Sequence, residues 1–154
     1  MTAIIFPGQG SQYVNMSMDF NANFDVDRKI FQEIEDSTGI NIRKIITENP
    51  LDNLNQTKYT QISIFSASMA IYSSLLNEIG NEIIKPNIFL GHSLGEYSAL
   101  AAGNLINISD ASILIKKRGE FMHSSIEPNV SGMAAIIGKN ASFIDDVIKK
   151  NNLK

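Results

Sequence analysis

The segment around Ser93 constrains the fold more than any other part of the sequence. Gly91-His92-Ser93-Leu94-Gly95 follows the glycine-x-serine-x-glycine pattern of a nucleophile elbow, in which a strand turns sharply into a helix and leaves the serine exposed. An apolar run at residues 87–90 precedes the pattern, and residues 94–102 read as a helix that ends at Gly103. The two flanking glycines remove Cβ atoms that would keep the strand and the helix apart. We therefore expect a βα turn that presents the Ser93 hydroxyl.

Strand and helix patterns alternate along the rest of the chain. Apolar runs predict a buried strand at residues 3–6 and further strands at 87–90 and 133–137. Helical spacing predicts helices at residues 25–38, 42–46, 51–54, 61–79 and 94–102, a helix capped by Ser109 that runs to about residue 124, and a helix at 142–150. The last of these places Phe143, Ile144, Val147 and Ile148 on its inward face. The order of elements predicts an α/β protein with a mainly parallel sheet, and the few strands predict an incomplete one.

Composition excludes several classes of function. Thirteen Lys and Arg against 16 Asp and Glu give a net charge of −3, so no basic stripe for nucleic acid is expected. The sequence has no cysteine and only two histidines, which argues against a metal centre. We find no continuous apolar run of membrane-spanning length and no signal-peptide pattern at the N-terminus, so a cytoplasmic protein without membrane contact is expected.

The elbow also predicts how charge is stabilised. A helix that starts just after Ser93 presents unpaired backbone N–H groups near the serine oxygen. The amide of Leu94 would therefore face an oxyanion formed after nucleophilic attack. A second donor has to come from another loop at the same sheet edge, and the glycine-rich loop at residues 7–11, which follows the first strand, is the candidate.

Four motifs together resemble one family. They are Phe6-Pro7-Gly8-Gln9-Gly10-Ser11-Gln12, the elbow extended through Leu100, Lys117-Arg118-Gly119-Glu120-Phe121-Met122, and Gly132-Met133-Ala134-Ala135-Ile136-Ile137-Gly138. In this order and at this spacing they resemble the malonyl-CoA:acyl-carrier-protein transacylases of fatty-acid synthesis, and more loosely the acyltransferase domains of polyketide synthases. The resemblance implies an α/β-hydrolase-like parallel-sheet core, incomplete here, followed by the start of an inserted ferredoxin-like small subdomain. It divides the chain at residues 1–127 and 128–154.

The resemblance also implies roles for individual residues. Ser93 would take malonyl from coenzyme A, and the backbone amides of Gln9 and Leu94 would form the oxyanion hole. Arg118 would hold the free carboxylate of malonate, which suits a guanidinium fork because acetyl would leave it unpaired. Gln61 matches a glutamine near the site, although this chain has Ile62 where the family usually has proline. The acceptor would be an acyl carrier protein, docked on a basic face for which Lys116 and Lys117 are candidates, with malonyl-CoA as substrate and no metal or bound cofactor.

The family's catalytic histidine lies beyond the residues of this chain. His92 adjoins Ser93, where successive side chains diverge, and His123 is five residues after Arg118, roughly 140° around the same helix. We expect neither to serve as the base, and therefore little or no turnover by this chain alone. The unclosed sheet predicts exposed apolar surface and association.

Two other functions fit the residues. A serine esterase of the α/β-hydrolase kind also uses an elbow, but it has no need of a carboxylate clamp, so Arg118→Ala would not change its acyl preference. A non-catalytic module that binds carrier protein or coenzyme A would bind its ligand without forming an adduct on Ser93.

Overall fold

The structure is a computed structural model that describes residues 2–125 and 136–152. Its described elements are two strands, a short 3₁₀ helix and eight α-helices. In chain order they are β1 (Ala3–Phe6), α1 (Met18–Asn23), α2 (Asp25–Thr38), α3 (Ile42–Glu48), η1 (Pro50–Asn55), α4 (Thr57–Ile79), α5 (Asn81–Ile84), β2 (Ile88–Gly91), α6 (Gly95–Ala102), α7 (Ile108–Ser124) and α8 (Ala141–Lys150). Helices therefore dominate this α/β chain.

The two strands pair in parallel, as the alternating pattern predicted. Phe6 lies opposite Gly91 and Ile4 opposite Phe89. The first strand was predicted to be buried, and this is wrong for Ile5, which is 70% exposed. Leu90 on β2 is also 48% exposed, in line with the exposed apolar surface expected of an incomplete sheet. Among the described residues, helices cover only one face of the strand pair.

Aromatic rings join that covered face to the central helix. The ring of Tyr72 on α4 stands edge-on to Phe6, with centroids 5.8 Å apart, and edge-on to Phe89 at 5.9 Å. Such edge-to-face pairs add to the stabilisation from apolar burial. β1 leads into the glycine-rich loop and β2 leads into the elbow. The packing of Phe6 and Phe89 on Tyr72 therefore fixes the positions from which the loop and the elbow start.

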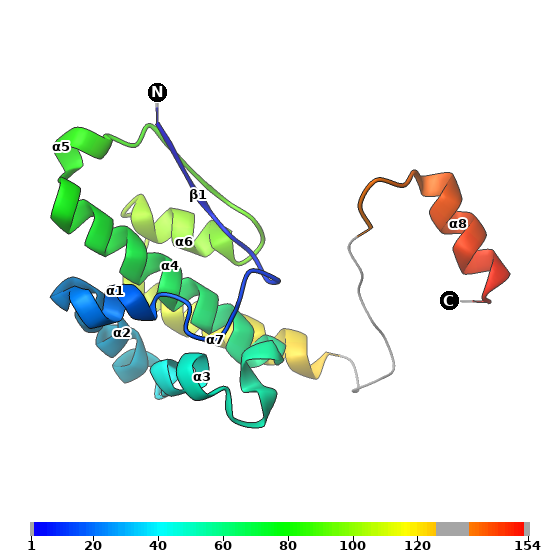
Figure 1. Cartoon of the computed structure of the whole chain (residues 1–154), viewed down its shortest axis with the longest axis horizontal. Coiled ribbons are helices and arrows are strands. Elements are labelled where there is room, and N and C mark those ends of the chain that lie inside the picture. The colour runs from blue at the N-terminus through cyan, green and yellow to red at the C-terminus, as the bar shows by residue number, and fades with distance from the viewer. Residues whose placement is uncertain (1, 126–135, 153–154) are drawn as a thin grey trace.

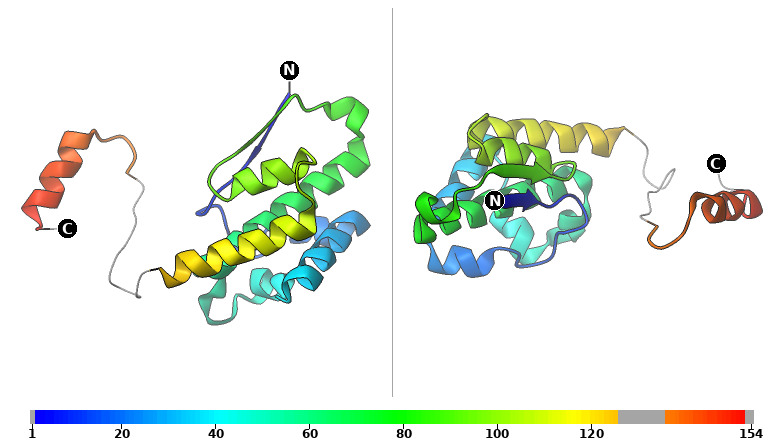
Figure 2. Two further views of the ribbon diagram at one scale, coloured as in Figure 1. Left: turned by 180° about the vertical axis from the view of Figure 1, so that it is seen from behind. Right: turned by 90° about the horizontal axis from the view of Figure 1, so that it is seen from above.

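Helix α4 is the centre of the fold, as its small side chains predicted. It packs against α2, α6 and α7, and α4 and α7 lie side by side along most of their length (Figure 1, Figure 2). By length and mean hydropathy, 1.2, α4 could cross a membrane, but 56% of that stretch is buried within this chain. This is the behaviour of a core helix. Serine and alanine on its sides permit the close approach of its neighbours.

Several predicted boundaries are wrong for local reasons. Helix α4 begins at Thr57 rather than Gln61, and the Thr60 hydroxyl bonds the Leu54 and Gln56 carbonyl oxygens at 2.7 and 3.0 Å. Helix α7 is capped by Asn107 instead of Ser109, because the Asn107 side-chain oxygen accepts from the Asp110 amide at 2.7 Å. Helices α1 and α5 were not predicted, since both are short and lack a clear apolar period.

The C-terminal part departs most from the prediction. The third strand, expected at 133–137, falls partly outside the described residues, and Ile136 and Ile137, which are described, are not in a strand. Helix α8 does form over Ala141–Lys150, but its expected inward face is not covered: Phe143, Val147 and Ile148 are 39–47% exposed. The amphipathic pattern thus predicted the helix correctly but not a surface for it to pack on.

Candidate active site

The turn between β2 and α6 has the geometry of a nucleophile elbow. Ser93 is exposed and adopts φ = +56°, in the left-handed region that residues other than glycine rarely occupy. A Cβ on Gly91 would lie 2.1 Å from the Gly95 carbonyl carbon, and one on Gly95 would lie 2.5 Å from the Phe6 carbonyl oxygen. Both positions therefore require glycine, as the motif predicted.

The glycine-rich loop after β1 lies directly against this elbow. A Cβ on Gly8 would lie 2.4 Å from Nδ1 of His92, so the absence of a side chain there makes room for the histidine ring. The His92 amide donates to the Phe6 carbonyl oxygen at 3.1 Å, which ties the loop start to the elbow. His92 therefore packs against the loop.

Two amides near the elbow are available to a ligand. Among the described residues, the backbone N–H groups of Gln9 and Leu94 have no hydrogen-bond acceptor. Loop and helix start bring these two donors to the same edge of the strand pair. The side chain of Leu94 is fully buried, which anchors its amide. The Gln9 side chain is held separately, by a 3.3 Å bond to the Thr57 hydroxyl on α4.

Arg118 reaches the serine from the opposite helix. Its Nη2 donates to Ser93 Oγ at 3.0 Å and its Nη1 to Gln61 Oε1 at 2.5 Å. Spacing along the chain predicts none of this, because Arg118 is 25 residues from Ser93 and 57 from Gln61. The structure thus brings Arg118, Ser93 and Gln61 together.

The next residue, Gly119, explains how the arginine comes so close. A Cβ there would lie 3.1 Å from the Lys58 Cα and 3.2 Å from the Thr57 carbonyl oxygen, so α7 touches the backbone of α4. Gln61 lies one turn further along α4 than this contact. The close approach therefore sets Gln61 and Arg118 within hydrogen-bond reach.

Neither histidine side chain is hydrogen-bonded to the nucleophile in the described part of the chain. Both His92 and His123 are exposed. The described residues also include no group of three metal-ligating side chains.

The lysines proposed for docking are engaged within the chain. Lys116 Nζ donates to the Thr38 carbonyl oxygen at 2.7 Å, at the end of α2, and Lys117 pairs with Glu120 at 3.1 Å. Lys116 therefore has a structural task, while the exposed Lys117 pair contributes little and can open to a partner.

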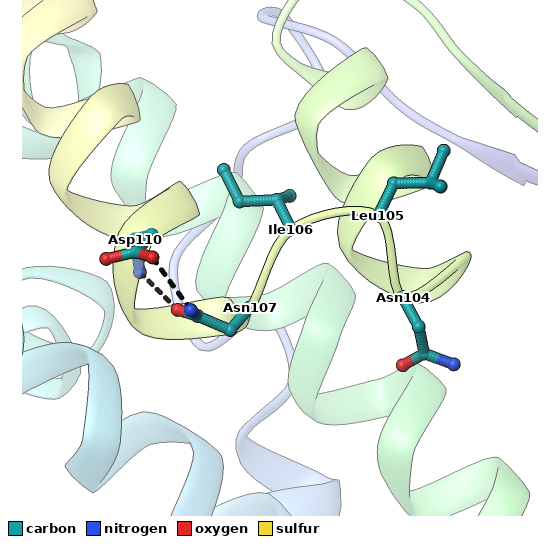
Figure 3. Close-up of a pocket in the computed structure, with 5 residues that line it drawn as sticks. All are labelled: Asn104, Leu105, Ile106, Asn107 and Asp110. Carbon is teal, nitrogen blue, oxygen red and sulfur yellow. Dashed lines mark hydrogen bonds between the residues drawn. The ribbon is translucent and has the colours of Figure 1, made fainter.

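A surface hollow lies away from these residues, at the turn between α6 and α7. It has a volume of about 360 Å³ and is lined by Asn104, Leu105, Ile106, Asn107 and Asp110 (Figure 3). The side chain of Asn107 bonds both the amide and a carboxylate oxygen of Asp110. The polar groups seen here thus cap α7, and none of the predicted site residues lines this hollow.

Comparison with known proteins decides the family. The sequence profile of the acyl transferase domain family matches residues 3–149. The chain belongs to this family. This acyl transferase chain is 38% identical over 142 residues to the malonyl CoA-acyl carrier protein transacylase of Salmonella typhimurium, a match that covers 92% of this chain and 45% of the relative.

Solved structures agree with that assignment. Malonyl CoA-acyl carrier protein transacylase from Clostridium perfringens matches with a TM-score of 0.81 and 36% identity, over 97% of this chain and 46% of that one. A transacylase in complex with a type II PKS acyl-carrier protein matches with a TM-score of 0.84 and 35% identity, over 97% of this chain and 47% of the solved one. The acyl transferase chain thus spans about half the length of the relatives it matches.

Proposed function

We propose that this chain carries the nucleophile, the oxyanion donors and the carboxylate clamp of an acyl-carrier-protein S-malonyltransferase of fatty-acid synthesis. The observation that carries the proposal is the contact of Arg118 with Ser93, because a fixed cation beside a nucleophile selects acyl groups that end in a carboxylate. We further propose that β1 and β2 belong to an α/β-hydrolase-like core at 1–127, and that residues 128–154 begin a ferredoxin-like small subdomain. A cytoplasmic location follows from the proposed pathway.

The proposed reaction has two half-reactions on Ser93. In the first, Ser93 Oγ attacks the thioester carbon of malonyl-CoA, the carbon–sulfur bond breaks, and the serine proton ends on the sulfur of coenzyme A. In the second, the phosphopantetheine thiol of an acyl carrier protein attacks the seryl ester, the carbon–oxygen bond breaks, and the thiol proton returns to Oγ. Charge on the tetrahedral intermediates falls on the Gln9 and Leu94 amides. Amide and guanidinium groups supply this stabilisation, so the proposal needs no resident cofactor.

Proton transfer is the step for which these residues lack a catalyst. A serine hydroxyl is a weak nucleophile without an adjacent base, and in the described part of the chain no histidine side chain is hydrogen-bonded to Ser93. Sites that lack one triad member retain about 10³–10⁴-fold acceleration over water. We therefore expect slow acylation by the 154-residue chain alone and fast turnover only when a base is supplied.

Intact-mass analysis after incubation with malonyl-CoA tests the proposal. We expect a malonyl adduct that accumulates slowly, forms faster at higher pH because a larger fraction of the hydroxyl is then ionised, and is absent in Ser93→Ala. Acetyl-CoA is the matched substrate without a carboxylate. Arg118→Ala should reduce the preference for malonyl-CoA over acetyl-CoA about ten- to a hundredfold, since a charged hydrogen bond contributes about 1.5–3 kcal/mol.

Three outcomes would contradict the proposal in different ways. An adduct that persists in Ser93→Ala places the nucleophile elsewhere. An adduct whose acyl preference is unchanged in Arg118→Ala favours the esterase. Measurable binding of malonyl-CoA with no adduct at any pH favours the non-catalytic module.

A further inference from the structure

Gln61 is an unusual residue in the centre of this helical core. Only 1% of the residue is exposed, yet its side chain ends in an amide that has both an acceptor oxygen and a donor NH₂ group. Its Oε1 accepts from Arg118 Nη1 at 2.5 Å, and its Nε2 donates to the sulfur of Met122 at 3.2 Å. A buried amide is costly unless its groups are paired, so both contacts matter.

The chemistry of the neighbours dictates which way the Gln61 amide points. A guanidinium has only donors, so the amide oxygen must face Arg118 and the NH₂ group must face away from it. On that side the partner is a thioether, which accepts hydrogen bonds but cannot donate them. The sulfur therefore favours the same amide orientation as the arginine does, whereas the flipped amide would set donor against donor at Arg118.

Met122 is placed for this by its helix. It lies four residues after Arg118 on α7, and residues four apart lie on the same helix face. Gln61 on α4 therefore meets both side chains from across the interface. Met122 as a whole residue is 43% exposed, so it lies at the edge of this interface.

We propose that Met122 is a positioning residue for the carboxylate clamp. Its sulfur holds the Gln61 amide with the oxygen toward Arg118, and Gln61 in turn fixes one end of the guanidinium so that the other end faces Ser93. This proposal rests on the proposed function, because the value of a fixed guanidinium is the recognition of the malonyl carboxylate. It assigns the arginine's orientation to two side chains, Gln61 on α4 and Met122 on α7.

The first test reads the contact itself and needs no substrate. In the ¹⁵N-labelled chain, the side-chain NH₂ signals of Gln61 are assigned by their loss in Gln61→Met. Met122→Leu, which keeps the volume but removes the acceptor, should shift these signals and speed their exchange with water. Met18→Leu is the matched control, because it makes the same change at a partly buried methionine whose sulfur accepts no bond within the described ranges. Gln61 signals that are unchanged in Met122→Leu overturn the proposal.

The second test reads the consequence for recognition. The preference for malonyl-CoA over acetyl-CoA, measured as the ratio of adduct formation rates on Ser93, should fall several-fold in Met122→Leu, up to about tenfold for each 1.4 kcal/mol lost. Met122→Gln, which restores an acceptor of similar reach, should recover most of it. In an Arg118→Ala background Met122→Leu should have no effect on the ratio, because the residue acts only through the arginine.

The outcomes separate this proposal from the proposed function. Equal loss of malonyl and acetyl rates in Met122→Leu, or a further fall of the ratio in the Arg118→Ala background, shows a general packing role and overturns the positioning role. If the original chain forms the adduct on Ser93 equally fast from malonyl-CoA and acetyl-CoA, the proposed function is overturned. In that case the Gln61 signals still decide whether Met122 orients the amide.

Discussion

The carboxylate of Asp27 is buried within the first turn of α2. It has no exposed surface and accepts hydrogen bonds from the Ser17 hydroxyl at 3.1 Å and the Asn21 side-chain amide at 2.9 Å. Burial raises the pKa of Asp27 above its ordinary value of 3.8, and the bonds from Asn21 and Ser17 oppose that rise only in part. The folded chain therefore holds this proton more tightly than the unfolded chain.

This raised pKa predicts a pH effect of definite sign. The stabilisation from the bound proton is fully present below the ordinary pKa of 3.8 and is lost as the pH rises through the folded pKa. Asp27→Asn, which keeps a neutral side chain at every pH, should remove this decline. Urea unfolding at a series of pH values measures it, with Asp36→Asn on the exposed side of α2 as the control. Parallel pH profiles for Asp27→Asn and the original chain would contradict the assignment.

At the level of single residues, the sequence predicted the features that depend only on neighbouring residues in the chain. The glycines at 91 and 95 indicated an exposed Ser93, and the structure agrees. The contact between Arg118 and Ser93 was expected only from the family resemblance, since it depends on how α7 packs on α4. The sulfur contact of Met122 had no signal in the sequence, because methionine in a helical pattern is typical of core packing.

At the level of elements, the elbow depends on contact between backbones. Gly95→Ala would place a Cβ 2.5 Å from the Phe6 carbonyl oxygen, where no flexible side chain can yield. We expect a loss of about 1–3 kcal/mol in the free energy of unfolding, the usual cost of overpacking, together with loss of adduct formation on Ser93.

Gly103→Ala is the matched control for this substitution. Gly103 ends the same helix with φ = −80°, and its Cβ would lie 3.3 Å from the Ala99 carbonyl oxygen, a tight but smaller intrusion. Its effect on urea unfolding should be the smaller of the two. Equal midpoints for Gly95→Ala and the original chain would show that the strand and helix can separate without cost.

Helix prediction succeeded where apolar spacing was long and failed at the ends. The spacing from Ile62 to Leu76 fixed the centre of α4, but its first turn depends on Thr60, whose hydroxyl bonds the preceding loop. The prediction of a buried first strand missed that Ile5 is exposed. A short apolar run indicates a strand but does not say whether one or both of its faces are covered.

At the level of the whole chain, one apolar surface predicts association. Leu90, Leu100 and Leu105 are 43–77% exposed and line a depression of about 500 Å³ between β2 and α6. Exposed apolar patches of this kind promote contact between molecules. Light scattering coupled to size-exclusion chromatography should show a mass that rises with concentration.

Charge placed in the depression should reduce that association. Leu100→Lys is the informative variant, and Leu51→Lys is the control, since Leu51 is 90% exposed and does not line the depression. Equal effects of the two variants would assign association to general solubility. A mass of the original chain that stays that of the monomer at every concentration would contradict the predicted association.

The 3.0 Å contact between Arg118 and Ser93 has a consequence for how tightly the site can hold its substrate. In the resting protein the guanidinium already donates to two oxygens, so a carboxylate that takes over the Nη2 donor displaces the serine hydroxyl from it. The free energy of binding malonyl-CoA is then the difference between the bond of Arg118 to the carboxylate and its bond to the hydroxyl. This difference is smaller than the energy of the ion pair alone. Such a site binds its substrate only moderately tightly but still distinguishes malonyl from acetyl. We therefore expect weaker binding of malonyl-CoA than an unpaired arginine would give.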